Sequence, residues 1–100
     1  MSIESVTDKI RSKMAMAHGI SARVKFDFDD EGVIFVDATQ NPPVISRDDA
    51  EADVTLACKI STLEAIMAGE QDPTMAFMMG KLKVRGSMGL AMKLNAILED

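Results

Sequence analysis

The segment from Met88 to Leu98 most constrains the fold, because it has helical spacing and is apolar nearly all round. One face of such a helix carries Leu90, Leu94, Ile97 and Leu98. Much of the other face carries Met88, Ala91, Met92 and Ala96. A helix of this kind must be buried on more than one side, and a chain of 100 residues offers little protein to cover it twice. The second face therefore needs a compact core, a partner chain, a membrane surface or an apolar ligand.

The preceding segment, Met75 to Met79, poses the same problem, because Met, Ala and Phe run around its whole circumference. Between the two segments, Lys81, Lys83 and Arg85 alternate with apolar residues, which predicts an edge strand with a basic face. Two apolar helices that flank one strand can enclose an apolar cavity or share a compact core. The residues alone favour neither arrangement.

The rest of the chain has clear periodicity. Helical spacing follows three candidate caps, Ser2, Ser61 and Asp72, and the Ser61–Glu64 stretch is typical of a capping box. Strict alternation predicts strands at 22–28, 33–36, 44–46, 54–60 and 81–85, with a hairpin turn at Asp30-Glu31-Gly32 and a chain break at His18-Gly19. This order favours one α+β domain over residues 1–100, with a mostly antiparallel sheet covered by helices.

Composition excludes several classes of protein. A net charge of -5 argues against a nucleic-acid binder. One cysteine, Cys58, cannot form an internal disulfide, and no apolar run is long enough to span a membrane. The N-terminus is not typical of a signal peptide. We therefore expect a soluble cytoplasmic protein. Nine methionines, with no Trp or Tyr, indicate apolar surfaces that adapt to their contents.

Metal and nucleic-acid motifs are weak. Asp27, Asp29 and Glu31 before Gly32 match the start of a calcium loop, but its twelfth position would be Ala38, and a charged hairpin face explains the acids better. Thioethers of the clustered methionines suit Cu(I), but no His or Cys is near them in sequence to complete a site.

A G-x-x-G pattern at 86–89 follows a strand, whereas the RNA-clamping loop of KH domains joins two helices. Histidine is present only as His18, at the predicted break. Cys58 falls on the apolar face of a strand, where a thiol is usually inert. We therefore predict no catalytic residues, no metal, no cofactor and no nucleic-acid partner.

The C-terminal half resembles the sterol carrier protein 2 (SCP-2) lipid-transfer family at Ala76-Phe77, Gly80-Lys81-Leu82-Lys83-Val84, Gly86 and Met88-Gly89-Leu90-Ala91-Met92-Lys93-Leu94. The resemblance implies a five-stranded, mainly antiparallel sheet with helices on one face. It also implies an apolar tunnel between sheet and helices for sterols, fatty acids, fatty acyl-CoA or related lipids, and no catalysis. Eukaryotic members often carry Gln where this chain has Met79, and no peroxisomal address follows Glu99-Asp100. The first departure argues against recognition of a sterol hydroxyl. The second favours a bacterial member, for which we do not expect a sterol ligand.

We therefore predict a non-enzymatic carrier of a long-chain lipid. Its expected lining residues are Met67, Met75, Phe77, Met78, Met79, Leu82, Met88 and Met92. Arg85 and Ser87 are the expected head-group residues, because a helix N-terminus and a nearby Arg both attract anions. Lys81 and Lys83 would draw an anionic lipid or membrane surface. The alternative is an interaction module that uses the same apolar faces for a partner or for homodimerisation, including an accessory factor that presents quinone-type lipids to enzymes.

Overall fold

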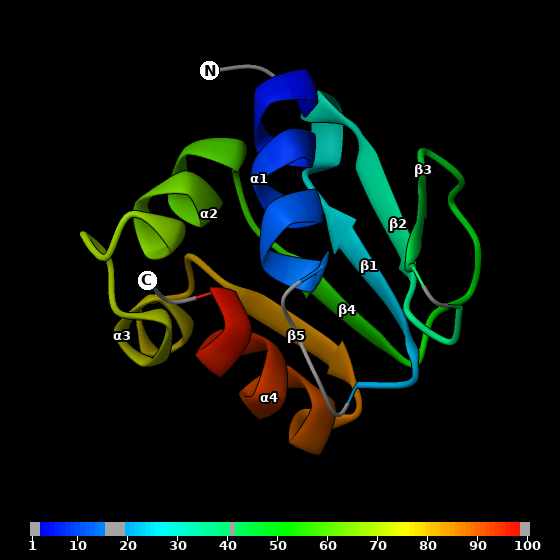
Figure 1. The fold of residues 1–100 in the computed structure, drawn as a ribbon. Helices are drawn as coiled ribbons and strands as arrows, with labels where there is room; N and C mark the ends of the chain where they lie inside the picture. Colours follow the sequence, from blue (N-terminus) through cyan, green and yellow to red (C-terminus); the bar gives the residue numbers. More distant parts are fainter. Residues whose placement is uncertain (1–2, 16–19, 41, 99–100) are drawn as a thin grey trace.

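A five-stranded sheet forms the centre of the structure, a computed structural model that describes residues 3–15, 20–40 and 42–98 (Figure 1). Its strands lie in the order β3-β2-β1-β4-β5. Their bounds are Arg23–Asp27 (β1), Val33–Asp37 (β2), Val44–Ser46 (β3), Val54–Ala57 (β4) and Lys83–Gly86 (β5). Neighbouring strands are antiparallel except β1 and β4, which are parallel. The prediction of a mainly antiparallel sheet is confirmed, and the sheet is mixed.

The hairpin of β1 and β2 follows from the alternation of apolar and charged residues. Val24 and Phe26 are buried and pair with Val36 and Ile34, which are buried too. A short 3-10 helix, η1 (Asp29–Glu31), makes the connection. Successive strand residues point to opposite faces. The apolar set therefore forms one face of the sheet, which packs under helices, and the charged set forms the other.

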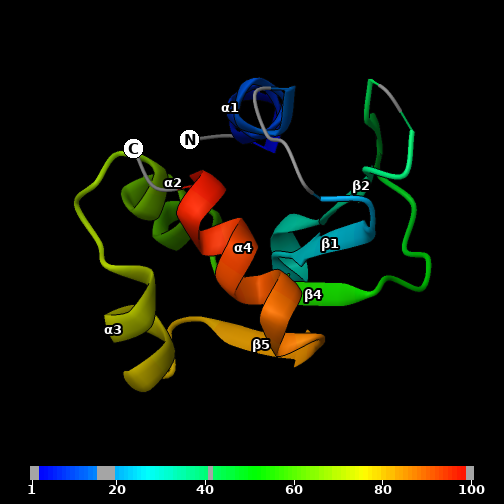
Figure 2. The ribbon, with the colours of Figure 1, turned by 60° about the horizontal axis from the view of Figure 1, so that its bottom comes forward.

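The helices are α1 (Ile3–Ala15), α2 (Ile60–Met67), α3 (Pro73–Met78) and α4 (Met88–Leu98). Figures 1 and 2 show α1 and α4 on the same face of the sheet, and none of the described α-helices covers the opposite face. The apolar stripe that helical spacing predicts for α1 is buried at Val6, Ile10 and Met14, while Ile3 packs partly against the core. We call the uncovered side the open face of the sheet.

The predicted start of α2 is wrong by two residues, because the cap is Lys59 and not Ser61. Ser61 lies inside the helix, whose first residue is Ile60 and whose cap, Lys59, makes no side-chain cap hydrogen bond. The Ile60 N–H donates instead to Glu31 Oε1, 3.2 Å away. A carboxylate from η1 thus takes the capping role that the sequence pattern assigned to Ser61. The predicted strand at 54–60 also ends earlier, since β4 stops at Ala57 and α2 begins at Ile60.

The cap of α3 is confirmed, because Asp72 Oδ1 accepts a hydrogen bond of 3.0 Å from the Thr74 N–H and Pro73 is the first helical residue. Ser87 likewise caps α4, since its Oγ accepts a hydrogen bond of 3.2 Å from the Leu90 N–H. The predicted Ser2 cap and the break at His18-Gly19 lie outside the described residues.

Candidate functional site

Large apolar side chains are exposed on the two helices that flank β5 in sequence. They are Met75, Phe77, Met78 and Met79 at α3, with Met88 and Met92 on α4. We call these six residues the methionine surface. Exposure reaches 74% at Met78 and 71% at Met92. Contiguous apolar residues on a protein surface usually mark a ligand, membrane or protein contact.

Helix α3 is oriented with its small residues inward and its large residues outward. Pro73 and Ala76 are its buried residues. The Ala76 carbonyl accepts hydrogen bonds of 2.8 Å from the Lys81 N–H and 3.1 Å from the Leu82 N–H. Leu82 then enters the core. The backbone and small side chains therefore fix α3, while its flexible thioethers remain available for contact.

Helix α4 divides its apolar residues as its helical spacing predicts. Leu94, Leu98 and the small Ala91 are buried in the core. Leu90 packs partly against the same core. Met92 lies on the other side and is exposed. The second face of α4 is therefore left without cover from the described part of this chain.

The eight predicted lining residues fall into two groups. Six form the methionine surface, and the other two, Met67 and Leu82, are buried in the core. Met67 also borders a pocket of ≈ 140 Å³ with Lys9, Lys13 and Glu64. The two groups do not line a common cavity in the described structure, so the contact of all eight with lipid stays a prediction.

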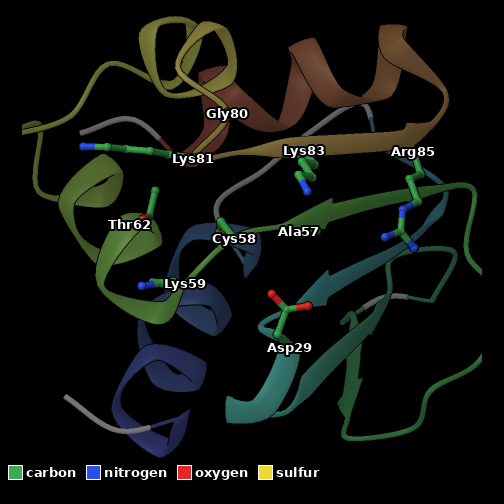
Figure 3. A pocket seen from close by; sticks show the side chains of 9 residues that line it. All are labelled: Asp29, Ala57, Cys58, Lys59, Thr62, Gly80, Lys81, Lys83 and Arg85. Atoms are coloured by element: carbon green, nitrogen blue, oxygen red, sulfur yellow. The ribbon is translucent and has the colours of Figure 1, made fainter.

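The open face of the sheet carries a pocket of ≈ 400 Å³ beside β5 (Figure 3). Four cations line it, Lys59, Lys81, Lys83 and Arg85, together with the acid Asp29. The remaining lining residues are Ala57, Cys58, Thr62 and Gly80. We call this site the basic pocket. It is notable because the chain as a whole carries a net charge of -5.

Strand alternation brings the cations of β5 together. Val84 packs against the core, so Lys83 and Arg85 on either side of it point to the open face. They pair with Ala57 and Thr55 of β4. Figure 3 shows both side chains extending from β5 towards Asp29, which points at them from the opposite side of the pocket. The same view shows Lys59 and Lys81 at the end of the pocket beside α2.

The cations of β1 on the same face have acidic partners. Lys25 Nζ lies 2.8 Å from Asp49 Oδ1, and Arg23 Nε lies 3.9 Å from Asp37 Oδ2. By contrast, the four cations of the basic pocket form no salt bridge with any acid in the described ranges. Their charges are therefore available to an external anion.

Cys58 forms part of the pocket wall and is buried. Burial raises the pKa of its thiol to about 12, and the charges of Glu31 and Asp29 act in the same direction. Such a thiol stays protonated at neutral pH and is a poor nucleophile.

The described residues contain no cluster of His, Cys, Asp or Glu able to hold a metal ion. No described helix is long and apolar enough to cross a membrane.

The structure does not bring the two predicted head-group residues together. Arg85 points to the open face, whereas the Ser87 hydroxyl caps α4. The sequence predicted the basic strand but missed Lys59 and Asp29 as parts of the same pocket. Both lie outside β5. The pairing of β4 with β5 brings Lys59 near β5, and the parallel pairing of β1 with β4 brings Asp29 there.

Known proteins are similar to this chain in sequence or in fold. A bovine protein, sterol carrier protein 2, is 49% identical over 51 residues, which are 51% of this chain and 9% of the bovine protein. The match thus spans only a small part of the bovine protein. The palmitated SCP2L2 of Aedes aegypti has a TM-score of 0.75 at 21% identity, covering 100% of this chain and 96% of that one. A ubiquinone synthesis protein, UbiJ-SCP2, has a TM-score of 0.62 at 14% identity. The match covers 94% of this chain and 77% of that protein's chain.

These likenesses agree with the element order and with the mixed sheet. The family model described as the SCP-2 sterol transfer family matches residues 3–99, which is nearly the whole chain. This chain belongs to the SCP-2 sterol transfer family.

Proposed function

We propose that this chain binds one long-chain lipid at the methionine surface and carries it without chemical change. The observation that carries the proposal is the outward orientation of the large apolar residues at α3 and of Met88 and Met92 on α4. Leaving such residues in water is unfavourable, and a lipid chain laid across them would remove that exposure. Flexible thioethers suit this task because they adjust to chains of different shape.

The expected affinity follows from the length of the chain that is buried. Each buried CH₂ contributes about 0.8 kcal/mol. Ten of them contribute about 8 kcal/mol, close to micromolar affinity before the costs of ordering the complex. Short chains should therefore bind weakly, and affinity should rise steadily with chain length.

Two comparisons support a lipid ligand. The family is described as one of sterol transfer. The Aedes aegypti neighbour is a palmitated protein, and its fold covers this whole chain. Met67 and Leu82 lie beneath the surface in the core, and we expect them to contact the chain only if α3 moves away from the core.

A titration across chain length tests the proposal. Fatty acids from octanoic to stearic acid would be added to the full chain, and binding followed by calorimetry. Affinity should increase with each added pair of methylenes. An affinity that does not depend on chain length would refute lipid binding at an apolar surface.

A second function is an interaction module that uses the same residues to dock a second copy or a protein partner, including an accessory factor that presents a lipid to enzymes. The specific support is the likeness in fold to UbiJ-SCP2, a ubiquinone synthesis protein. Native mass spectrometry of gently purified protein separates the two. Co-purified lipid on a monomer supports the carrier. A lipid-free dimer whose mass in sedimentation depends on concentration supports the interaction module.

A further inference from the structure

We propose that the basic pocket is a second ligand site, separate from the methionine surface. It takes a phosphate ester whose alcohol portion carries hydrogen-bond donors, either hydroxyl or ammonium. The proposal rests on the charges and geometry around Lys83, Arg85 and Asp29 (Figure 3).

The first argument is the difference between two parts of one sheet face. On β1, Lys25 and Arg23 each have a carboxylate partner within the fold. On β5, Lys83 and Arg85 have none among the described residues. Like charges held close together without a partner repel one another. An anion that enters the pocket would relieve this repulsion, so the pocket is prepared for a ligand that the chain does not supply.

The second argument identifies phosphate as the anion. A carboxylate brings a single charge, whereas a phosphate monoester brings about -1.5 to -2 at neutral pH and three strong acceptor oxygens. Lys83 and Arg85 are two residues apart on one strand, which separates their backbones by about 6.6 Å. One phosphate between the two side chains can accept the forked donors of Arg85 and the ammonium of Lys83 together. Lys59 and Lys81 add attraction from the end of the pocket.

The third argument concerns the rest of the ligand. Asp29 faces the cations from the opposite wall (Figure 3). Because a carboxylate only accepts hydrogen bonds, it favours a hydroxyl or ammonium group at that position and disfavours a second anion. The volume of ≈ 400 Å³ exceeds what one phosphate fills and leaves room for such a group above Ala57 and Cys58.

Strand geometry makes this site independent of the lipid site on α4. Val84 and Arg85 are consecutive, so they point to opposite faces of β5. Val84 faces the core beneath the helices, and Arg85 faces the uncovered side. A phosphate ester can therefore bind whether or not the methionine surface is occupied, and failure at either site leaves the other proposal standing.

The test is a calorimetric titration of the full chain at low ionic strength with glycerol 3-phosphate, phosphoethanolamine and inorganic phosphate. Both esters should bind saturably and more tightly than inorganic phosphate. Arg85→Gln and Lys83→Gln should each weaken ester binding about tenfold, the cost of one charge-assisted hydrogen bond. Lys93→Gln is the matched control, because Lys93 is exposed on α4 and does not line the pocket. It should change affinity less than about twofold.

Asp29→Asn provides a test of opposite sign. It removes a negative charge, so inorganic phosphate should bind more tightly. It also removes the charged acceptor for the donor groups, so phosphoethanolamine should bind more weakly. The proposal is overturned if neither ester binds saturably, if Lys93→Gln weakens binding as much as Arg85→Gln, or if Asp29→Asn strengthens all ligands alike.

Vesicles distinguish a lipid head group from a free metabolite. Phosphatidylcholine vesicles with and without phosphatidylinositol 4-phosphate, whose head group carries a phosphate monoester beside free hydroxyls, would be cosedimented with the wild type, Arg85→Gln and Lys93→Gln. Greater recruitment by phosphatidylinositol 4-phosphate that Arg85→Gln abolishes and Lys93→Gln retains assigns the site to a lipid head group. Equal recruitment by both vesicles, with binding of the soluble esters retained, assigns it to a free phosphate ester.

Discussion

Gly86 lies so close to the carbonyl oxygen of Asp53 that a Cβ atom at position 86 would overlap it. The two residues meet where the end of β5 pairs with Val54 at the start of β4, and the next residue, Ser87, donates its N–H to the same carbonyl at 3.0 Å. Gly86 also has a φ of +91°, which residues with a side chain rarely adopt. This contact sets the position from which α4 starts.

Gly86→Ala should therefore destabilise the fold. Backbone strain of this kind costs about 1–3 kcal/mol, and the overlap with Asp53 adds to it. The free energy of unfolding in urea is the measurement. Gly89→Ala is the control, because a Cβ there approaches nothing closer than 3.9 Å and Ala favours a helix over Gly by about 0.5–1 kcal/mol. Equal stabilities of the two variants would contradict the close approach at Gly86.

Leu94→Ala should lower stability and Met92→Ala should lower lipid affinity, because the two residues lie on opposite sides of α4. Leu94 is 0% exposed, so truncation should cost about 2–5 kcal/mol of unfolding free energy. Met92→Ala at the exposed position should change stability by less than about 0.5 kcal/mol. It should instead weaken the binding of stearic acid. Unchanged fatty-acid binding in the Met92 variant would remove α4 from the lipid site.

Cys58 should make stability depend on alkaline pH. Its folded pKa of about 12 lies above the ordinary thiol value of 9.0, so folding favours the protonated thiol. This contribution is complete below pH 9.0 and is lost as the pH rises towards about 12, at about 1.4 kcal/mol per pH unit. Urea unfolding at pH 8 and pH 10.5 should show a larger loss for the wild type than for Cys58→Ala. Parallel losses in both proteins would show that the thiol makes no contribution.

Hydrogen exchange should separate α3 from α4. Little apolar surface ties α3 to the core, since Pro73 and Ala76 are its buried residues. Local opening of such a segment costs less than global unfolding. Amides of α3 should exchange well before that of Leu94, and saturating fatty acid should slow them selectively. Exchange of α3 as slow as that of α4, or no response to fatty acid, would contradict the proposed role of α3.

Periodicity predicted the helices and strands because burial of one face enforces it. The stripe of α1 and the hairpin of β1 and β2 needed no information beyond residue spacing. The start of α2 could not be predicted from spacing, because Glu31, which accepts a hydrogen bond from the Ile60 N–H, is 29 positions away in sequence. Sequence patterns describe local competition for backbone groups and do not reveal a side chain that arrives from elsewhere in the fold.

The candidate sites were predictable to different degrees. Spacing correctly separated Leu94 from Met92 on α4, but it did not reveal that the methionine side would lie exposed. The alternation of β5 already placed Arg85 on the face opposite α4. The expected role of Arg85 and Ser87 at one head group followed their closeness in sequence. The Ser87 hydroxyl caps α4, and the contact of both residues with a head group stays a prediction. Asp29 had no detectable signal, because its place opposite β5 depends on the order of strands in the sheet.

Five of the nine methionines lie on the methionine surface, where dissolved oxidants can reach their sulfur atoms. Oxidation to methionine sulfoxide turns a flexible apolar side chain into a polar one, and reductases reverse the change. Because these side chains are outside the core, the fold would survive the modification while the apolar surface lost its affinity for hydrocarbon. The methionines that adapt to a lipid are thus also the residues whose oxidation by peroxide would abolish lipid binding.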